Sequence, residues 1–344
     1  MSVHTASDAD PDHRPTLAEV AAGADVSLKT ASRALSGEPH VSPGTLARVL
    51  AEARRLGYQR NAAASLLASG RTVDTIGVLT GDFTNPFYAG LAQGVEVEAR
   101  GKSIRMAVAS TGEDPDTEWE LAQNMAAQRA KAVIVVSAMV EHSRYASLSA
   151  SGTTVVFADR ATRGIEADSV VLDNYHGGCL AAQHLLDAGH HRIAYIGDYE
   201  WLPTHRDRVA GFGETLAAAG VLRWGGLVRT GVHDVDSARV AATTLLMASP
   251  RPTAIVAGNN RIALGVLQSL VALPEARTTA VIGFDDVEWA GIVGLTVIAQ
   301  DPVAMGRQAA RLALARIEDQ SRAAQTVVMP TSLTENGSGE RRPA

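Results

Sequence analysis

The chain has 344 residues, of which 46% are hydrophobic and 4% aromatic, with a single cysteine and a formal net charge of −6. This composition allows two or three domains with buried cores and excludes an internal disulfide framework. No apolar run approaches the roughly 20 residues that cross a bilayer, and the N-terminus lacks the apolar segment of a secretion signal. The sequence therefore predicts a cytoplasmic protein with no membrane partner.

The charge is distributed unevenly along the chain. Residues 14–71 hold eight basic and four acidic side chains, so this stretch carries +4 and the remainder carries −10. A basic segment on an acidic body is suited to binding the phosphates of nucleic acid at one place. Residues 1–14, rich in Asp, Ser, Pro and His, are predicted to be a disordered tail.

Residues 15–60 predict a small helical unit. Thr16 and Glu19 have the spacing of a capping box, which starts a first helix with an apolar stripe. After a short turn, Ser27 is placed to cap a second helix over residues 28–35. Two short helices joined by such a turn are typical of a helix-turn-helix.

The predicted second helix has two different faces. Ala31 and Ala34 can pack inward, whereas Lys29 and Arg33 lie one turn apart on the outer face, beside hydroxyl side chains. Such a face suits phosphates and base edges in a major groove. A generic three-helix bundle with a solvated basic face is the alternative interpretation of the same pattern.

A third helix and a short Ala-rich segment follow. Ser42 and Pro43 predict the start of this helix, and Gly57 predicts its end. Residues 61–73 allow at most two turns of helix, too few to be stable alone in water, so they are predicted to be a hinge that folds against a partner. Leu67 in this hinge is an apolar side chain of the kind that can enter a minor groove.

This stretch resembles the DNA-binding headpiece and hinge of the lactose-repressor (LacI/GalR) family of bacterial transcription regulators. The matching segments are TLAEVAAGADVSLKTASRAL, VSPGTLARVLAEARRLGY and NAAASLLASGRT. The resemblance implies a homodimer that bends a pseudo-palindromic operator, with the second helix in the major groove and leucines wedged into the minor groove. The DNA-binding residues are then expected to be Thr16, Ser27, Leu28, Lys29, Thr30, Ser32, Arg33, Ser36, Asn61, Ala64 and Leu67.

From Thr75 onward, short apolar runs alternate with helix-length amphipathic stretches. Runs buried on both faces and separated by helices predict parallel sheets built from strand–helix units. About ten such strands are too many for one compact sheet, so two sheets with a cleft between them are expected. The runs are TIGVLT, SIRMAVAS, KAVIVVSA, TTVVFAD, DSVVLDN, HRIAYIGD, GLVRTG, TAIVAGN, TAVIGFDD and LTVIAQD.

The expected fold class is an all-α helix-turn-helix headpiece followed by an α/β effector domain with two doubly wound parallel-sheet subdomains. The family resemblance agrees, because it implies an effector domain built like a periplasmic binding protein; its marks include DFTNPFYAGLAQGVEVEARG, RVAGFGETLAAAG and AVIGFDD. We assign residues 74–172 and 301–323 to the first subdomain and residues 173–300 and 324–334 to the second. Residues 335–344, polar and Gly-rich, are predicted to be disordered.

The loops that follow the predicted strands supply candidate effector-binding residues. Carboxylates and amides accept hydrogen bonds from sugar hydroxyls, arginine donates in a fixed fork, and an aromatic face covers a sugar ring. The alternative is that strand-end Asp and Asn side chains only cap the next helix. The effector-binding residues are predicted to be Phe83, Asn85, Phe87, Asp159, Arg208, Asn260 and Asp285, with Asp82, Arg160, Asn259 and Asp286 in the same loops. The resemblance favours Arg208 and Asp285 most, and it places Asn260 where many relatives have Asp.

The sequence contains no motif that would support an enzyme. It has no glycine-rich phosphate loop, no nucleophile elbow and no zinc-protease motif, so neither an enzyme nor a cofactor is predicted. His190 and His191, close to Asp187, suggest a metal site, but a basic residue at a helix C-terminus is the favoured interpretation.

The sequence therefore predicts a dimeric transcription regulator, most simply a repressor, whose operator affinity depends on a carbohydrate bound in the cleft. Induction and co-repression are equally compatible with it, since only the ligand's differential affinity decides the sign. A periplasmic-type solute-binding protein without DNA function is the alternative.

Overall fold

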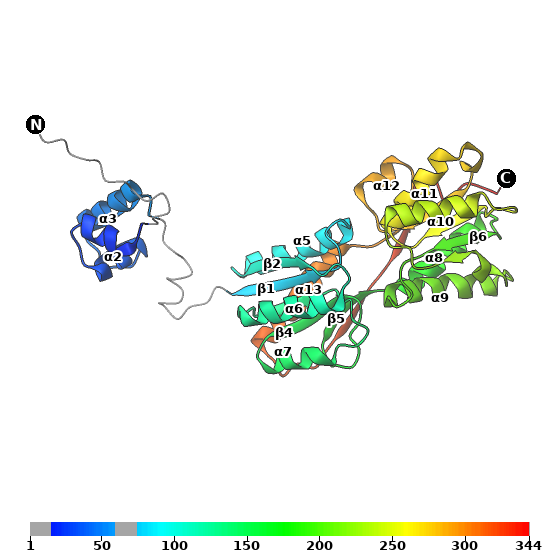
Figure 1. Ribbon diagram of the computed structural model, residues 1–344. Helices are drawn as coiled ribbons and strands as arrows, with labels where there is room; N and C mark the ends of the chain where they lie inside the picture. Colours follow the sequence, from blue (N-terminus) through cyan, green and yellow to red (C-terminus); the bar gives the residue numbers. More distant parts are fainter. Residues whose placement is uncertain (1–14, 59–73, 344) are drawn as a thin grey trace, which may run out of the picture. The chain divides into compact units, whose positions relative to one another are not determined.

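The computed structural model describes residues 15–58 and 74–343 (Figure 1). The chain divides into a headpiece unit, Met1–Val73, and an effector unit, Asp74–Ala344. The predicted N-terminal tail and the predicted hinge at residues 61–73 lie outside the described residues. Within the described ranges, no helix is long and apolar enough to span a bilayer.

The headpiece contains the three predicted helices, which are α1 (Leu17–Gly23), α2 (Leu28–Leu35) and α3 (Pro43–Leu56). Thr16, Ser27 and Ser42 cap these helices, and Glu19 completes the predicted capping box with Thr16. Small apolar side chains from all three helices form the core, namely Val20, Ala21, Ala24, Ala31, Ala34, Val49 and Ala53. Because these side chains are small, the helices approach closely and leave the outer face of α2 to solvent.

The first subdomain of the effector unit is built on a six-stranded, fully parallel sheet with the order β11-β5-β4-β3-β1-β2. Its strands are β1 (Thr75–Thr80), β2 (Arg105–Ser110), β3 (Ala132–Val135), β4 (Thr154–Asp159), β5 (Asp168–Leu172) and β11 (Thr326–Met329). Its helices are α5 (Pro86–Gly101), α6 (Pro115–Ala127), α7 (Ala146–Ala150) and α13 (Pro302–Glu318).

The second subdomain repeats this architecture with the order β12-β10-β9-β8-β6-β7, in which β12 alone is antiparallel to its neighbour. Its strands are β6 (Ile193–Ile196), β7 (Val228–Arg229), β8 (Ala254–Ala257), β9 (Ala280–Phe284), β10 (Thr296–Ala299) and β12 (Ser332–Thr334). Its helices are α8 (Asn174–Asp187), α9 (Pro203–Ala218), α10 (Val235–Leu246), α11 (Asn260–Ala272) and α12 (Glu288–Ile292). All ten strands predicted from apolar runs are therefore present.

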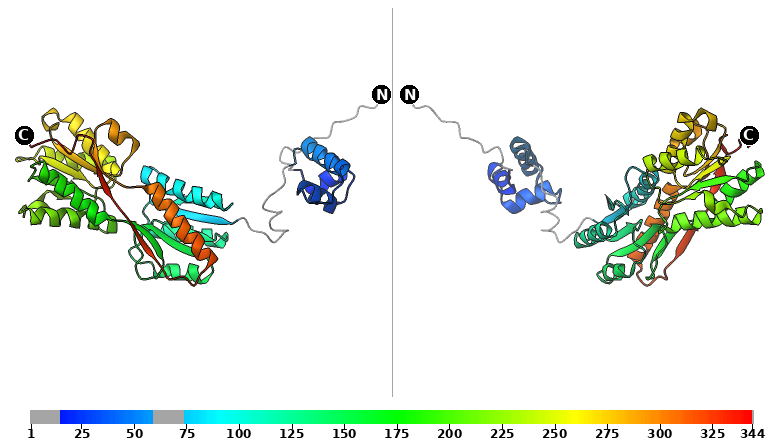
Figure 2. Two further views of the ribbon diagram at one scale, coloured as in Figure 1. Left: turned by 180° about the vertical axis from the view of Figure 1, so that it is seen from behind. Right: turned by 45° about the vertical axis from the view of Figure 1, so that its right-hand side comes forward.

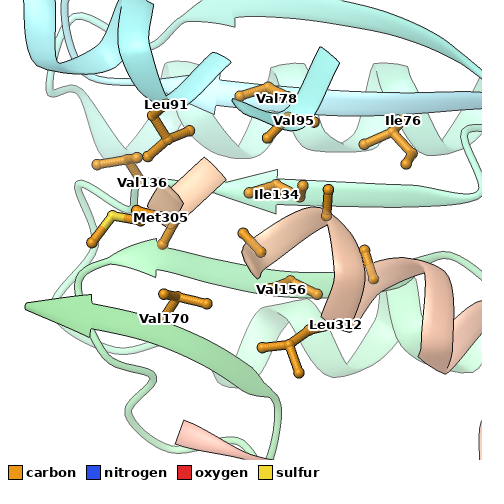
Figure 3. Packing of buried hydrophobic residues seen from close by; sticks show 14 of the residues in the cluster. Ile76, Val78, Leu91, Val95, Ile134, Val136, Val156, Val170, Met305 and Leu312 are labelled. Carbon is orange, nitrogen blue, oxygen red and sulfur yellow. The ribbon is translucent and has the colours of Figure 1, made fainter. Parts of the chain in front are cut away.

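Each sheet is covered by helices on both faces. In the first subdomain, α5 and α13 cover one face, where Leu91, Val95 and Met305 pack on alternate strand residues such as Ile134 and Val156 (Figure 3). Helices α6 and α7 cover the opposite face. In the second subdomain, α10, α11 and α12 cover one face and α8 and α9 the other. Burial on both faces explains why the strands read as continuous apolar runs rather than alternating ones.

The chain passes between the two subdomains three times, after β5, after β10 and between β11 and β12. Figure 2 shows the last passage as the red segment that runs from one sheet to the other. Strand β11 pairs with β5, so the expectation that residues 324–334 belong wholly to the second subdomain is wrong. Strand β11 completes the first sheet beside β5, and of these residues only β12 joins the second sheet.

The C-terminal residues are also ordered, contrary to the prediction of a disordered tail. The Ser338 hydroxyl donates to the Val281 carbonyl oxygen at 2.5 Å and accepts from the Thr296 N–H at 2.8 Å. A ring nitrogen of His190 lies 2.7 Å from the Arg341 carbonyl oxygen, so this histidine anchors the tail to the second subdomain. Polar, Gly-rich composition predicted disorder, but these hydrogen bonds fix the segment on the second subdomain.

Glycines bring two helix pairs into backbone contact. A Cβ atom on Gly94 in α5 would collide with the Val303 carbonyl oxygen of α13, and one on Gly306 in α13 would collide with the Leu91 carbonyl oxygen. In the second subdomain, Gly178 of α8 lies in the same way against the Arg208 carbonyl oxygen of α9. Only glycine permits this approach, because any side chain would separate the helices.

We predict that Gly94→Ala destabilises the effector unit by about 1–3 kcal/mol, because the added methyl group must displace backbone rather than a flexible side chain. Gly101→Ala, at the end of the same helix, is the matched control, since a Cβ there meets no atom within 4 Å. Urea denaturation followed by circular dichroism measures both variants. Equal stabilities of the two variants would contradict the close approach of α5 and α13.

Candidate DNA-binding surface and effector cleft

The outer face of α2 is the candidate DNA-binding surface. Leu28 is 54% exposed and Lys29 is also exposed, whereas Ala31 and Ala34 are buried in the headpiece core. The helix therefore has the two faces that the sequence predicts. The exposed face begins at the helix N-terminus, the positive end of the helix dipole, which attracts phosphate.

Several predicted DNA-binding side chains already have partners within the headpiece. The Ser27 hydroxyl accepts from the Thr30 N–H at 3.1 Å, and the Ser36 hydroxyl donates to the Ser32 carbonyl oxygen at 2.7 Å. Arg33 donates through Nε to the Glu38 carboxylate at 3.2 Å. This ion pair is solvent-exposed and therefore weak, so Arg33 can exchange it for a base or a phosphate.

The remaining predicted contacts fall into two groups. Thr16 is exposed at the start of α1, where its N–H and hydroxyl both donate to the Glu19 carboxylate. Asn61, Ala64 and Leu67 lie outside the described residues.

The candidate effector site is a cavity between the carboxyl ends of the two sheets. It is lined from the first subdomain by Asn85, Phe87, Tyr88, Asp159 and Arg160 and from the second by Asp198, Leu202, Thr204, Arg208, His233, Asn259 and Asp285. Its volume is about 50 Å³, which holds only a few water molecules. A sugar can therefore enter only after the two subdomains move apart.

Five of the seven predicted effector-binding residues line this cavity. The two others do not: Phe83 is 60% exposed, and Asn260 lies at the edge of the cleft, where it bridges the subdomains. Asp286, in the same loop as Asp285, is exposed and lies outside the cavity.

Arg208 is held rigidly with one side of its guanidinium available. Its Nε donates to the Asn174 side-chain oxygen at 2.8 Å, and its Nη1 donates to the Gly258 carbonyl oxygen at 2.6 Å. The guanidinium also lies 4.3 Å from the ring centre of Phe284. Within residues 74–343, no hydrogen-bond partner is found for Nη2, so this nitrogen can donate to a ligand without rearrangement.

Two aspartates at equivalent strand ends face the same space. Asp159 is the last residue of β4 and Asp285 directly follows β9, and both adopt positive φ angles, 66° and 71°. This backbone conformation is uncommon for non-glycine residues and often marks functional sites. Asp285 accepts from the side chains of Asn260, at 2.7 Å, and Gln300, at 2.6 Å.

Asp159 is the less satisfied of the two carboxylates. It is 7% exposed, and its contact with the Arg160 Nε is long, at 3.8 Å. Burial raises the pKa of Asp159 to about 6, against the opposing effect of the nearby arginines. An unsatisfied carboxyl group in a closed cavity is a ready acceptor for ligand hydroxyls.

Arg160 serves mainly as a structural element of the cavity floor. Its two terminal nitrogens bind both carboxylate oxygens of Glu113, at 2.7 and 2.8 Å, and one of them also donates to the Ser137 carbonyl oxygen. The Tyr88 hydroxyl lies 3.2 Å from Nη2. This bidentate pair consumes most of the donor capacity of Arg160.

The predicted set omitted the second subdomain's Asp198 and His233, which form a hydrogen bond of 2.8 Å beside the cavity. The hydrogen bond to Asp198 raises the pKa of His233, and burial lowers it. The effect of the hydrogen bond is the larger, so the pKa of His233 is raised. Asp198 is separated from the end of β6 only by Gly197, so the strand-end rule used for Asp159 would have found it. His233 lies further from its strand, at the end of the loop between β7 and α10, and gives no comparable signal.

Two polar contacts join the subdomains at the edge of the cleft. The Asn260 side-chain N–H donates to the Asn85 side-chain oxygen at 2.8 Å, and Arg261 forms an ion pair of 3.0 Å with Asp82. Asp82 and Asn85 both lie just before α5, and Asn260 and Arg261 are the first two residues of α11. These contacts hold the cleft in the closed state described here.

The described ranges contain no cluster of three or more His, Cys, Asp or Glu side chains arranged to bind a metal ion. His190 instead uses its two ring nitrogens on the Thr253 hydroxyl, at 2.9 Å, and on the C-terminal segment.

We predict that Asp159→Asn becomes progressively more stable than the native chain as the pH rises. Because the folded-state pKa is raised, the stability contributed by the protonated carboxyl is present below about pH 4 and is lost as the pH rises through about 6. The difference in unfolding free energy between the two proteins should change by up to about 3 kcal/mol over this interval.

Urea denaturation of both proteins between about pH 4 and pH 7 measures this difference. Asp116→Asn, an exposed position at the start of α6, is the control. A pH-independent difference for Asp159→Asn would show that its carboxyl is not desolvated.

Comparison with known proteins connects both surfaces to one family. Residues 16–61 match the family model described as bacterial regulatory proteins, lacI family, and residues 73–330 match periplasmic binding proteins and sugar binding domain of LacI family. Catabolite control protein A of Priestia megaterium is 33% identical over 302 residues, which cover 86% of this chain and 91% of that protein. The ribose operon repressor of Bacillus subtilis is 31% identical over 323 residues, covering 92% and 96%.

A solved structure gives the same result. The transcriptional regulator CelR in complex with cellobiose is 29% identical, has a TM-score of 0.69 and covers 94% of this chain and 100% of its own. The match of residues 16–61 to a regulatory-protein family disfavours the alternative of a solute-binding protein without DNA function. The chain belongs to the LacI family of bacterial regulatory proteins and is a DNA-binding regulator of transcription.

Proposed function

We propose that this regulator is a repressor whose affinity for a pseudo-palindromic operator is controlled by a carbohydrate bound between the subdomains. The observation that carries the proposal is the arrangement of Arg208, fixed with Nη2 available, in the same cavity as the carboxylates of Asp159 and Asp285. A fixed donor in one cavity with two acceptors matches the paired donor and acceptor character of adjacent sugar hydroxyls. Similar proteins include a regulator solved with cellobiose and a ribose operon repressor.

The coupling follows from the residues that line the cavity. Because they come from both subdomains, a ligand that touches both favours one angle between them. To open the closed cleft, the contacts of Asn260 with Asn85 and of Arg261 with Asp82 must break. Residues 61–73, the predicted hinge, connect the first subdomain to the headpiece in the chain, so we propose that a change in that subdomain reaches the DNA-binding unit through them.

A homodimer is the form that binds a two-fold operator. In the second subdomain, α11 and the C-terminal end of α12 expose apolar side chains, among them Val271 at 72% and Ile292 at 85%. Leu264 and Val293 are also exposed, and together with Val271 and Trp289 they line a groove. A patch of this kind is stabilised by pairing with the same patch on a second copy. We propose that the dimer acts in the cytoplasm, where its operator is found.

We predict that Arg33→Ala weakens binding to the specific operator by about 1–3 kcal/mol and relaxes base selectivity. The reason is that the guanidinium lies on the exposed face of α2, where it can leave Glu38 for a base edge. Arg54→Ala removes the same charge from α3 and serves as the control. Fluorescence anisotropy on labelled operator measures both variants, and equal losses would refute the assignment of α2 as the reading helix.

We predict that Arg208→Lys retains operator binding but lowers the affinity for the carbohydrate effector by about tenfold or more, because lysine loses the fixed fork. Arg206→Lys, on the exposed face of the same helix, is the matched control. Anisotropy of the protein–operator complex, titrated with the sugar that alters the native protein's binding, measures the effect. An unchanged sugar midpoint for Arg208→Lys would place the effector elsewhere.

A further inference from the structure

The charge on the walls of the effector cavity restricts the ligands that it can accept. The cavity is lined by three carboxylates and by three basic side chains, namely Asp159, Asp198, Asp285, Arg160, Arg208 and His233. Because the two numbers are equal, the preference for a neutral or an anionic ligand depends on which of these groups already have a charged partner.

Two of the three basic side chains are already paired. Arg160 binds both carboxylate oxygens of Glu113, a residue outside the cavity lining, and these two side chains are only 4% and 6% exposed. His233 forms its hydrogen bond of 2.8 Å with Asp198, which also accepts from the Asn259 side-chain N–H at 2.9 Å. A buried ion pair such as that of Arg160 is not given up to a ligand, because the partner would be left as an uncompensated charge.

Two of the three carboxylates lack a close cationic partner. Asp285 accepts from the amide groups of Asn260 and Gln300, which are neutral, and no ion pair of Asp285 is found within residues 74–343. Asp159 reaches Arg160 only at 3.8 Å. Burial raises the pKa of Asp159 to about 6, which still leaves this carboxyl mostly ionised at neutral pH. The cavity therefore contains an excess of negative charge.

This excess does not depend on how far the cleft is open. The pair of Arg160 with Glu113 lies within the first subdomain, and the pair of His233 with Asp198 lies within the second. Opening the cleft also separates Arg261 from Asp82, which releases one charge of each sign at its edge. The balance of charge is therefore the same in the closed and open forms.

The N-terminus of α9 is the feature of the cavity that favours an anion. No side chain caps this helix, and Thr204 in its first turn lines the cavity, so the positive end of the helix dipole faces a ligand. Arg208 Nη2, one turn further along the helix, adds a donor. A phosphate group, however, carries about two negative charges at neutral pH. It would gain one arginine and the partial charge of α9, and it would meet the carboxylates of Asp159 and Asp285.

We propose that the effector is an uncharged carbohydrate and that the cavity rejects the phosphate esters of the same sugars. This inference rests on the proposed function, since it concerns the ligand of the same site. A hydroxyl group both donates and accepts, so adjacent hydroxyls bond to the Asp159 carboxylate and to Arg208 Nη2 without adding charge. An ammonium group cannot accept from Arg208, and a phosphate dianion cannot donate to Asp159.

Isothermal titration calorimetry of the full-length protein with matched pairs of ligands tests the proposal. Glucose, galactose, fructose, ribose and cellobiose are each titrated beside the monophosphate ester of the same sugar at a primary hydroxyl. We expect a free sugar of this panel to bind and its ester to bind at least about 100-fold more weakly, because the phosphate meets two carboxylates. An ester that binds as tightly as its parent sugar, or more tightly, would overturn the proposal.

The variant Glu113→Gln separates the charge of the phosphate from its size. It removes the charge that neutralises Arg160, while the amide oxygen can still accept from this guanidinium. The affinity for the ester should therefore rise by about tenfold relative to the affinity for the free sugar. Glu120→Gln removes the same charge from an exposed position of α6 and should leave this ratio unchanged. Equal ratios in the two variants would also overturn the proposal.

The failure of this inference can be distinguished from the failure of the proposed function. If a phosphate ester binds best and anisotropy shows that it alters operator binding, control by a carbohydrate stands and the selection against charge is refuted. If neither the free sugars nor their esters bind, the proposed control by a carbohydrate is contradicted, and the inference that rests on it is refuted as well.

Discussion

The two parallel sheets of the effector unit direct the carboxyl ends of their strands toward one another, and the candidate site depends on this constraint. Every strand of a parallel sheet ends on the same edge, so polar residues that are distant in sequence, such as Asp159 and Asp285, meet in one cavity. The helices on each face hold the sheets rigid, and glycine contacts such as the one between Gly178 and the Arg208 carbonyl oxygen fix the helices. The site is therefore assembled from rigid parts, and the angle between the subdomains is its main variable.

This angle is controlled by few contacts, which makes the cleft suitable as a switch. Asn260 has a central position, because its side-chain nitrogen donates both to Asn85 across the cleft and to Asp285 within its own subdomain. A ligand changes the population of the closed state only by its differential affinity for closed and open forms. Opening the cleft breaks a few hydrogen bonds, each contributing about 1 kcal/mol. A sugar that makes several hydrogen bonds of its own can therefore determine the equilibrium between the closed and open forms.

Sequence patterns predicted the parts of the fold that rest on local physics. Caps at Thr16, Ser27 and Ser42 and the ten apolar runs gave the helices of the headpiece and the strands of both sheets. The pairing of β11 with β5 was not predicted, because an edge strand can join either sheet and periodicity does not choose between them. The tail was mispredicted because its order depends on single hydrogen bonds, such as that of Ser338, which composition does not reveal.

The residues of the candidate site were likewise predicted only in part. The strand-end rule led to Asn85, Asp159 and Asp285, all of which line the cavity. It could not show that Phe83 is directed to solvent or that Asn260 bridges the cleft, since both depend on side-chain positions within a loop. His233 comes from a loop after the short strand β7, and no pattern in the sequence connects it to the partner Asp198.

The central claim is that a small molecule in the cleft controls DNA binding. Its most direct test is fluorescence anisotropy of labelled DNA from the region flanking the gene, with the full-length protein and a panel of monosaccharides and disaccharides, pentitols and nucleosides. The account predicts sequence-specific binding that one carbohydrate either releases, as an inducer, or tightens, as a co-repressor. Binding that no member of the panel alters would contradict the proposed control by a carbohydrate, and failure to bind such DNA at low salt would contradict the account as a whole.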